Sequence, residues 1–102
     1  MTNITPEEVK QRLEAGEKLN LLDVREPYEN AEFNIGGILK PIGKIQMMQI
    51  EDIEDLRNEE VILYCRSGNR SGIAAMVLDK LGFTNTKNLT GGMISWQQKF
   101  KS

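Results

Sequence analysis

Short apolar runs, separated by polar and glycine-containing segments, divide the chain into alternating strands and helices. Buried strands are predicted over 19–24 (LNLLDV) and 61–64 (VILY), and shorter strands near Ile38 and over 86–89. The unbroken apolar run VILY is typical of a central parallel strand that is covered on both faces. Irregular chain is expected around Ile38, because residues 34–45 contain three glycines and a proline.

Capping residues and apolar residues at helical spacing predict helices between these strands. Thr5 is suited to cap a first helix that begins with Pro6 and ends at Gly16. Ile4 is expected to pack against Val9 as a hydrophobic staple at the start of this helix. The other predicted helices are a short one entered through Pro27, one or two turns within 45–56 packed on the sheet, a largely buried helix from about Ser71 or Gly72 to Lys80, and a closing helix over 94–100 anchored by Trp96.

This alternation implies parallel strands joined by right-handed crossovers, and hence an α/β fold. The 102 residues contain no internal repeat or linker, which predicts one domain over residues 1–102. Thirteen basic and fifteen acidic side chains give a net charge of -2, so no positive field is available to hold a nucleic acid. The longest apolar run, IAAMVL at 73–78, is too short for a bilayer, and the polar start MTNITPEE lacks the features of a signal peptide. We therefore expect a cytoplasmic protein with neither nucleic acid nor a membrane as partner.

Cysteine and histidine counts restrict the chemistry that the chain can perform. There is one cysteine and no histidine, which excludes an internal disulfide, a Cys-x-x-Cys redox pair, a Ser-His-Asp triad and a zinc cluster. No metal or cofactor is expected. A nucleophile in this chain has to be activated by backbone dipoles or cationic neighbours, and Cys65 is the candidate.

Cys65 follows the predicted strand 61–64 directly, and the carboxyl ends of parallel strands are where ligands bind. The backbone amides of the next residues are expected to curl into a nest that adds to the positive end of the following helix. Such a nest, with adjacent arginines, lowers the pKa of a cysteine and attracts anions. The sequence thus predicts Cys65 as nucleophile, followed by a loop that binds an anionic substrate: Arg66, Ser67, Gly68, Asn69, Arg70 and Ser71.

Two other interpretations apply to the same residues. A cysteine at the end of an apolar strand is more often a small buried residue without chemistry. The segment after it, RSGNRSG, has two arginines, two glycines and three small polar residues, which suit an anion cradle better than a core. A generic phosphate-binding loop is less consistent with it, because the Lys-Ser or Lys-Thr ending of a P-loop is missing.

Three ordered motifs, LLDVREPYE at 21–29, YCRSGNRSGIAAMVLDKLGF at 64–83 and NLTGGMISW at 88–96, make the sequence similar to the single-domain rhodanese-like sulfurtransferases. The resemblance implies a five-stranded, mostly parallel sheet with helices on both faces. It also implies that Cys65 accepts a sulfane sulfur as a persulfide, with the loop from Cys65 to Arg70 holding that sulfur. The donor would be a small anion such as thiosulfate, and the acceptor cyanide, an external thiol or a protein. Asp23 and Arg25 match a strand-end motif for which a structural role is expected.

The chain departs from its relatives at Asn34, where they commonly carry a histidine, and at Gly36, near the site of a usual proline. Asparagine can hydrogen-bond and cap but does not titrate near neutral pH, so we expect a structural role for Asn34.

Three alternatives to a free-standing sulfurtransferase remain at this point. Cysteine phosphatases and arsenate reductases of related architecture have a C-x5-R loop, one residue longer than the loop from Cys65 to Arg70. A binding or sensory module would use the loop only to dock an anion or a carboxylate. A sulfur carrier would be loaded by another enzyme and would deliver sulfur to a biosynthetic acceptor.

Overall fold

The computed structural model describes residues 1–101, which form one sheet of five strands around which the helices pack. The strand order is β1-β5-β4-β2-β3, and every neighbouring pair is parallel. The strands are β1 (Thr2–Ile4), β2 (Leu21–Asp23), β3 (Ile38–Leu39), β4 (Glu60–Tyr64) and β5 (Asn85–Leu89). The predicted α/β fold is confirmed, and its sheet is parallel throughout.

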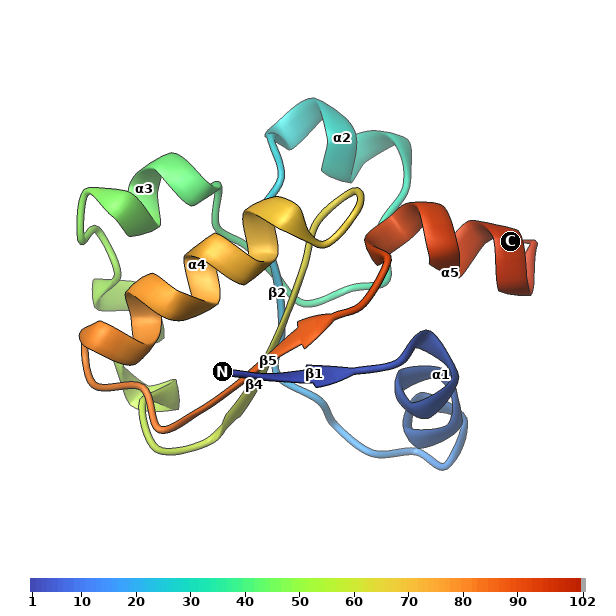
Figure 1. Cartoon of the computed structure of the whole chain (residues 1–102), viewed down its shortest axis with the longest axis horizontal. Coiled ribbons are helices and arrows are strands. Elements are labelled where there is room, and N and C mark those ends of the chain that lie inside the picture. The colour runs from blue at the N-terminus through green and yellow to red at the C-terminus, as the bar shows by residue number, and fades with distance from the viewer. Residues whose placement is uncertain (102) are drawn as a thin grey trace.

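Helices cover both faces of the sheet, as right-handed crossovers require. The helical segments are α1 (Pro6–Glu14), α2 (Pro27–Glu32), α3 (Ile42–Gln46), the 3-10 helix η1 (Glu51–Leu56), α4 (Asn69–Lys80) and α5 (Gly92–Phe100). The helices α1 and α5 pack on one face of the sheet, and α3, η1 and α4 pack on the other (Figure 1). Among residues 1–101, no helix is both long enough and apolar enough to cross a bilayer.

Strand β4 divides its side chains between two hydrophobic cores. Val61, Leu63 and, after the strand, Cys65 face the core under α3, η1 and α4. Ile62 and Tyr64 face the core that α1 and α5 cover. Because successive side chains of a strand point to opposite faces, a strand buried on both sides reads as the continuous apolar run VILY.

The first helix follows its predicted caps. The Thr5 hydroxyl accepts a hydrogen bond from the Glu8 amide at 3.2 Å, Pro6 occupies the first turn, and the helix ends at Glu14, shortly before Gly16. The strand β1 in front of it was missed. Ile4 does lie in one core with Val9, but it also pairs with Leu89 of β5, a partner that no local pattern indicates.

Three further predictions need correction. The segment expected to be irregular contains the short helix α3, whose Ile42 and Ile45 pack on the core. The spacing of Met47, Ile50, Ile53 and Leu56 predicts that all four pack on the sheet, but Met47 is exposed. Helix α4 begins at Asn69, two residues before Ser71, because Gly68 takes a left-handed conformation with φ 103° and turns the chain at once into the helix.

Candidate active site

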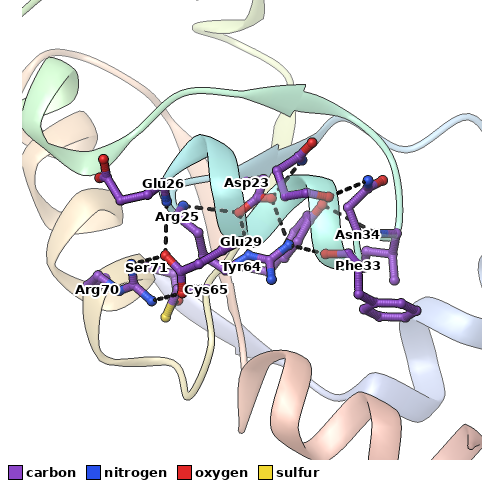
Figure 2. A network of polar contacts seen from close by, with 12 residues as sticks. Asp23, Arg25, Glu26, Glu29, Phe33, Asn34, Tyr64, Cys65, Arg70 and Ser71 are labelled. Carbon is purple, nitrogen blue, oxygen red and sulfur yellow. Dashed lines mark hydrogen bonds and ion pairs between the residues drawn. The ribbon is translucent and has the colours of Figure 1, made fainter. Parts of the chain in front are cut away.

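The sulfur of Cys65 lies inside the loop that joins β4 to α4 (Figure 2). The Gly68 amide donates a hydrogen bond to Sγ over 3.1 Å, and the Ser71 hydroxyl oxygen lies 3.4 Å from it. Cys65 is 1% exposed. The side chain points inward because Cys65 continues the alternation of β4, and the loop then turns its polar groups back onto the sulfur.

The loop favours the thiolate form of Cys65. Burial by itself raises the pKa of the Cys65 thiol, but hydrogen bonds to the sulfur outweigh burial and bring that pKa below its usual value. The donors, in order of effect, are the Ser71 hydroxyl and the amides of Ser71, Gly68 and Ser67. These amides belong to the loop that was predicted to curl into a nest. Hydrogen bonds to the sulfur are the largest of the effects that lower the pKa of Cys65 and so favour the thiolate.

Asn88 of β5 holds the loop from the side, and no local pattern in the sequence indicates this role. Its Nδ2 donates to the carbonyl oxygen of Gly68 over 3.1 Å, and its Oδ1 accepts a hydrogen bond from the Ser71 hydroxyl at 2.5 Å. Asn88 thereby fixes the residue whose amide faces Sγ and the hydroxyl next to Sγ. Its place in the motif NLTGGM was the only available signal, because pairing with Gly68 depends on how β5 lies beside β4.

The start of α5 contacts the same loop from another direction. The Met93 amide donates to the carbonyl oxygen of Cys65 over 2.9 Å, and the Ile94 amide donates to that of Arg66 over 3.0 Å. The first amides of a helix have no partner within the helix, so they are free to bind these loop carbonyls.

The two arginines of the loop have different surroundings. Arg70, in the first turn of α4, forms a two-pronged ion pair with Glu29 of α2, with both N–O distances at 2.8 Å (Figure 2). This pair holds the pKa of the Glu29 carboxyl down at about 2. Arg66 is exposed and forms no ion pair within the described part of the chain. Arg66 is therefore the loop cation whose charge is not balanced by a neighbour.

A pocket of about 510 Å³ opens beside the loop. Arg66 and Arg25 contribute positive charge to its wall, and Glu29 and Glu32 contribute negative charge. Its other lining residues are Tyr28, Phe33, Met93, Ile94 and Gln97, so the pocket lies between the loop, α2 and the start of α5. Of the predicted site residues, this pocket includes Arg66.

Asp23 and Arg25 have the structural role that was predicted for them. The Arg25 guanidinium donates to both carboxylate oxygens of Asp23 at 2.9 Å, and also to the Phe33 carbonyl oxygen at 2.6 Å (Figure 2). Asn30 of α2 donates to the same carboxylate over 2.8 Å. Tyr64 extends this network by donating its hydroxyl proton to the Gly36 carbonyl oxygen over 2.9 Å. The network fixes the segment between α2 and β3 on the end of the sheet.

Asn34 is also structural. Its Nδ2 donates to the Asn30 carbonyl oxygen at the end of α2, and its Oδ1 accepts from the Gly36 amide, each over 2.9 Å. The asparagine thus closes the turn that follows α2, which agrees with the structural role expected for it.

The structure places the predicted loop residues in three groups. Gly68 and Ser71 contact the sulfur directly, and Ser67 contributes its backbone amide. Arg70 faces Glu29, and Arg66 lies at the pocket. Asn69 is exposed and begins α4.

Comparison with known proteins agrees with this geometry. The model of the rhodanese-like domain matches residues 5–99 of the chain. The chain belongs to the rhodanese-like domain family. A sulfurtransferase of Allochromatium vinosum is 34% identical over 96 residues, which cover 94% of this chain and 88% of that protein. The crystal structure of a rhodanese-like domain protein from Staphylococcus aureus superposes with a TM-score of 0.78 at 28% identity, covering 94% of this chain and 91% of that one.

Some relatives are longer than this chain. YrkF of Bacillus subtilis, a candidate sulfur carrier protein, is 37% identical over 97 residues, which cover 94% of this chain and 51% of YrkF. The rhodanese-like chain therefore spans about half of the length of that relative.

Proposed function

We propose that the protein is a sulfurtransferase that moves a sulfane sulfur from an anionic donor such as thiosulfate to cyanide or a thiol, through a persulfide on Cys65. The observation that carries this proposal is the sulfur of Cys65 held by the Gly68 amide and next to the Ser71 hydroxyl, with the pKa of the thiol lowered. Membership of the rhodanese-like family and the likeness to a sulfurtransferase support it.

In the first step, the Cys65 thiolate attacks the outer sulfur of the donor. For thiosulfate, the bond between the two sulfur atoms of the donor breaks, sulfite leaves with the electron pair, and Cys65 carries a persulfide with one negative charge. The amides of Ser67, Gly68 and Ser71 stabilise this charge as an oxyanion hole stabilises oxygen. Cys65 is 1% exposed, so the loop has to admit the outer sulfur for the attack.

Arg66 is the residue that we assign to the anionic end of the donor. It lies at the pocket beside the loop and has no ion-pair partner in the described residues, whereas the charge of Arg70 is balanced by Glu29. A charge-assisted hydrogen bond from Arg66 to the departing sulfite would stabilise the leaving group. Arg70 instead holds Glu29, and with it α2, against the loop.

In the second step, a nucleophile from outside these residues removes the sulfur. The 102 residues contain no second cysteine that could resolve the persulfide. Attack of cyanide on the outer sulfur yields thiocyanate and restores the Cys65 thiolate, and a thiol acceptor would leave as its own persulfide. The covalent intermediate predicts ping-pong kinetics.

The variant Cys65→Ser tests the proposal. We expect complete loss of thiosulfate:cyanide activity with an unchanged melting temperature, because the hydroxyl is a far weaker nucleophile and fits the same space. Mass spectrometry of the wild-type protein after incubation with thiosulfate should show one added sulfur on the peptide that contains Cys65. Turnover retained in Cys65→Ser would refute the proposal. Hydrolysis of a phosphotyrosine analogue, lost in Cys65→Ser, would favour a phosphatase instead.

A further inference from the structure

The double glycine of the motif NLTGGM has no part in the proposed chemistry, yet it brings α5 against the catalytic loop. Gly92 is buried and has φ 55°. A Cβ atom at Gly92 would lie 2.4 Å from the carbonyl oxygen of Cys65 and 2.6 Å from the carbonyl carbon and oxygen of Arg66. These are backbone atoms, which cannot move aside as the end of a long side chain would. Only glycine fits between the helix and the loop in this arrangement.

The contact sets the direction of two peptide groups in the loop. The carbonyls of Cys65 and Arg66 point to α5, where they accept hydrogen bonds from the amides of Met93 and Ile94. In a trans peptide the carbonyl and the following amide point in opposite directions, and the described chain has no cis peptide. The Ser67 amide therefore points away from α5, and it contributes to lowering the pKa of the Cys65 thiol. The next amide along the chain, that of Gly68, donates to the sulfur over 3.1 Å.

We propose that Gly92 is a positioning residue for the nucleophile: by admitting the first turn of α5 to the loop, it orients the loop amides towards the sulfur of Cys65. Gly92 acts through the carbonyls of Cys65 and Arg66 and touches neither donor nor acceptor. The inference deepens the proposed function and rests on it only for its effect on turnover, because the ionisation of Cys65 can be measured without any sulfur donor.

The first experiment compares Gly92→Ala with Gly91→Ala. Gly91 also has a positive φ, 72°, and a Cβ there would come as close as 2.5 Å to an atom of Ser95, but it would press on α5 itself and not on the loop. Both variants therefore strain the same turn. We expect Gly92→Ala to raise the pKa of Cys65, measured from the pH dependence of its alkylation by iodoacetamide, and to lower kcat/KM about a hundredfold. Gly91→Ala should keep the wild-type pKa.

The second experiment removes one hydrogen bond without adding bulk at Gly92. Ile94→Pro deletes the amide that binds the Arg66 carbonyl, at a place in the first helical turn where that amide has no partner within the helix. Ile94→Ala is its matched control, because it removes the same exposed side chain and keeps the amide. We expect the pKa of Cys65 to be higher in Ile94→Pro than in Ile94→Ala.

The results separate this proposal from the proposed function. If Gly92→Ala folds with the melting temperature of Gly91→Ala and Cys65 keeps its pKa, the positioning role of Gly92 is wrong. If Gly92→Ala does not fold, equal pKa values in the two Ile94 variants contradict the proposal. A raised pKa in Gly92→Ala, together with a wild-type protein that never takes up sulfur, would support the positioning role and contradict the sulfurtransferase.

Discussion

At the scale of single residues, the ionisation of Cys65 depends on the small number of hydrogen-bond donors around its sulfur. The Ser71 hydroxyl has one proton, and two acceptors adjoin it: Asn88 Oδ1 at 2.5 Å and Cys65 Sγ at 3.4 Å. The backbone amides donate to the sulfur in addition, and the Gly68 amide does so at 3.1 Å. Asn88 therefore competes with Cys65 for the single hydroxyl proton, whereas the amides donate to the sulfur in directions that the backbone fixes.

Replacing Ser71 by alanine should raise the pKa of Cys65, because the Ser71 hydroxyl bond lowers that pKa. A higher pKa leaves less thiolate at neutral pH, so alkylation should slow there and reach the wild-type rate only at alkaline pH. The rate of alkylation across a pH series measures this shift. Ser67→Ala serves as control, since Ser67 acts on the sulfur through its backbone amide, which the variant keeps. A pKa that stays the same in Ser71→Ala would contradict the role of the hydroxyl.

At the scale of elements, α2 is tied to two others by polar side chains. Asn30 of α2 binds Asp23 at the end of β2, and Glu29 binds Arg70 in α4. Because α2 also contributes Glu29 and Glu32 to the wall of the pocket, these ties determine the charge on that wall. Arg70 acts in this arrangement by neutralising Glu29.

Arg70→Ala tests this indirect role. The variant removes the ion pair with Arg70 and leaves the Glu29 carboxylate without a counter-charge at the pocket. This carboxylate should repel an anionic donor, so we expect the KM for thiosulfate to rise about tenfold, the size of effect expected when one charge-assisted pair is lost. The double variant Arg70→Ala with Glu29→Gln removes both charges and should recover most of that loss. Steady-state kinetics at constant ionic strength provides the comparison. If the double variant is as impaired as Arg70→Ala, Arg70 instead binds the donor directly.

At the scale of the whole molecule, Glu60 joins three elements. Its carboxylate accepts hydrogen bonds from Arg12 of α1 at 2.6 and 3.0 Å and from Lys87 of β5 at 2.6 Å, while Glu60 itself belongs to β4. The Arg12 hydrogen bond, which outweighs burial, and the further bond from Lys87 bring the pKa of the Glu60 carboxyl to about 2. The Glu60 carboxylate thus helps to hold α1 on its face of the sheet, which is opposite to the face covered by α4.

The sign of the pH dependence follows from the lowered pKa of Glu60. The carboxyl has its usual value of 4.5 in the unfolded chain and about 2 in the folded one, so its stabilisation is complete above 4.5 and is lost as the pH falls towards 2. Glu60→Gln should lower the melting temperature at neutral pH, and its difference from the wild type should shrink through that window. Glu14→Gln, an exposed carboxylate with no ion pair in residues 1–101, should change the melting curve little. A difference that is constant from pH 7 to about 2 would contradict the assignment.

Local features of the sequence predicted much of this structure. Thr5 and Pro6 cap and begin a helix locally, and the apolar run VILY is typical of a strand buried on both faces, as β4 is. Cys65 and the small polar residues after it predicted a loop with inward amides, and Gly68 and Ser71 do contact the sulfur. In each case the determining groups are only a few residues apart.

Other elements depend on contacts between distant segments. The three-residue strand β1 exists because β5 offers an edge to pair with, and its own pattern has one buried residue. Arg70 lies in the first turn of α4, but its charge is balanced by Glu29, which lies 41 positions away in the sequence. A charged side chain in a motif does not indicate which opposite charge will reach it.

The alternation of strands and helices, the parallel sheet and the small polar loop after Cys65 could be predicted from the sequence, because caps, strand periodicity and turns act over a few residues. Three contacts follow instead from the packing of remote segments: the ion pair of Arg70 with Glu29, the hydrogen bonds of Asn88 with Gly68 and Ser71, and the close approach of Gly92 to Cys65. These depend on how β5, α2 and α5 come together around one loop, and such distances between remote segments are fixed by packing of the whole chain.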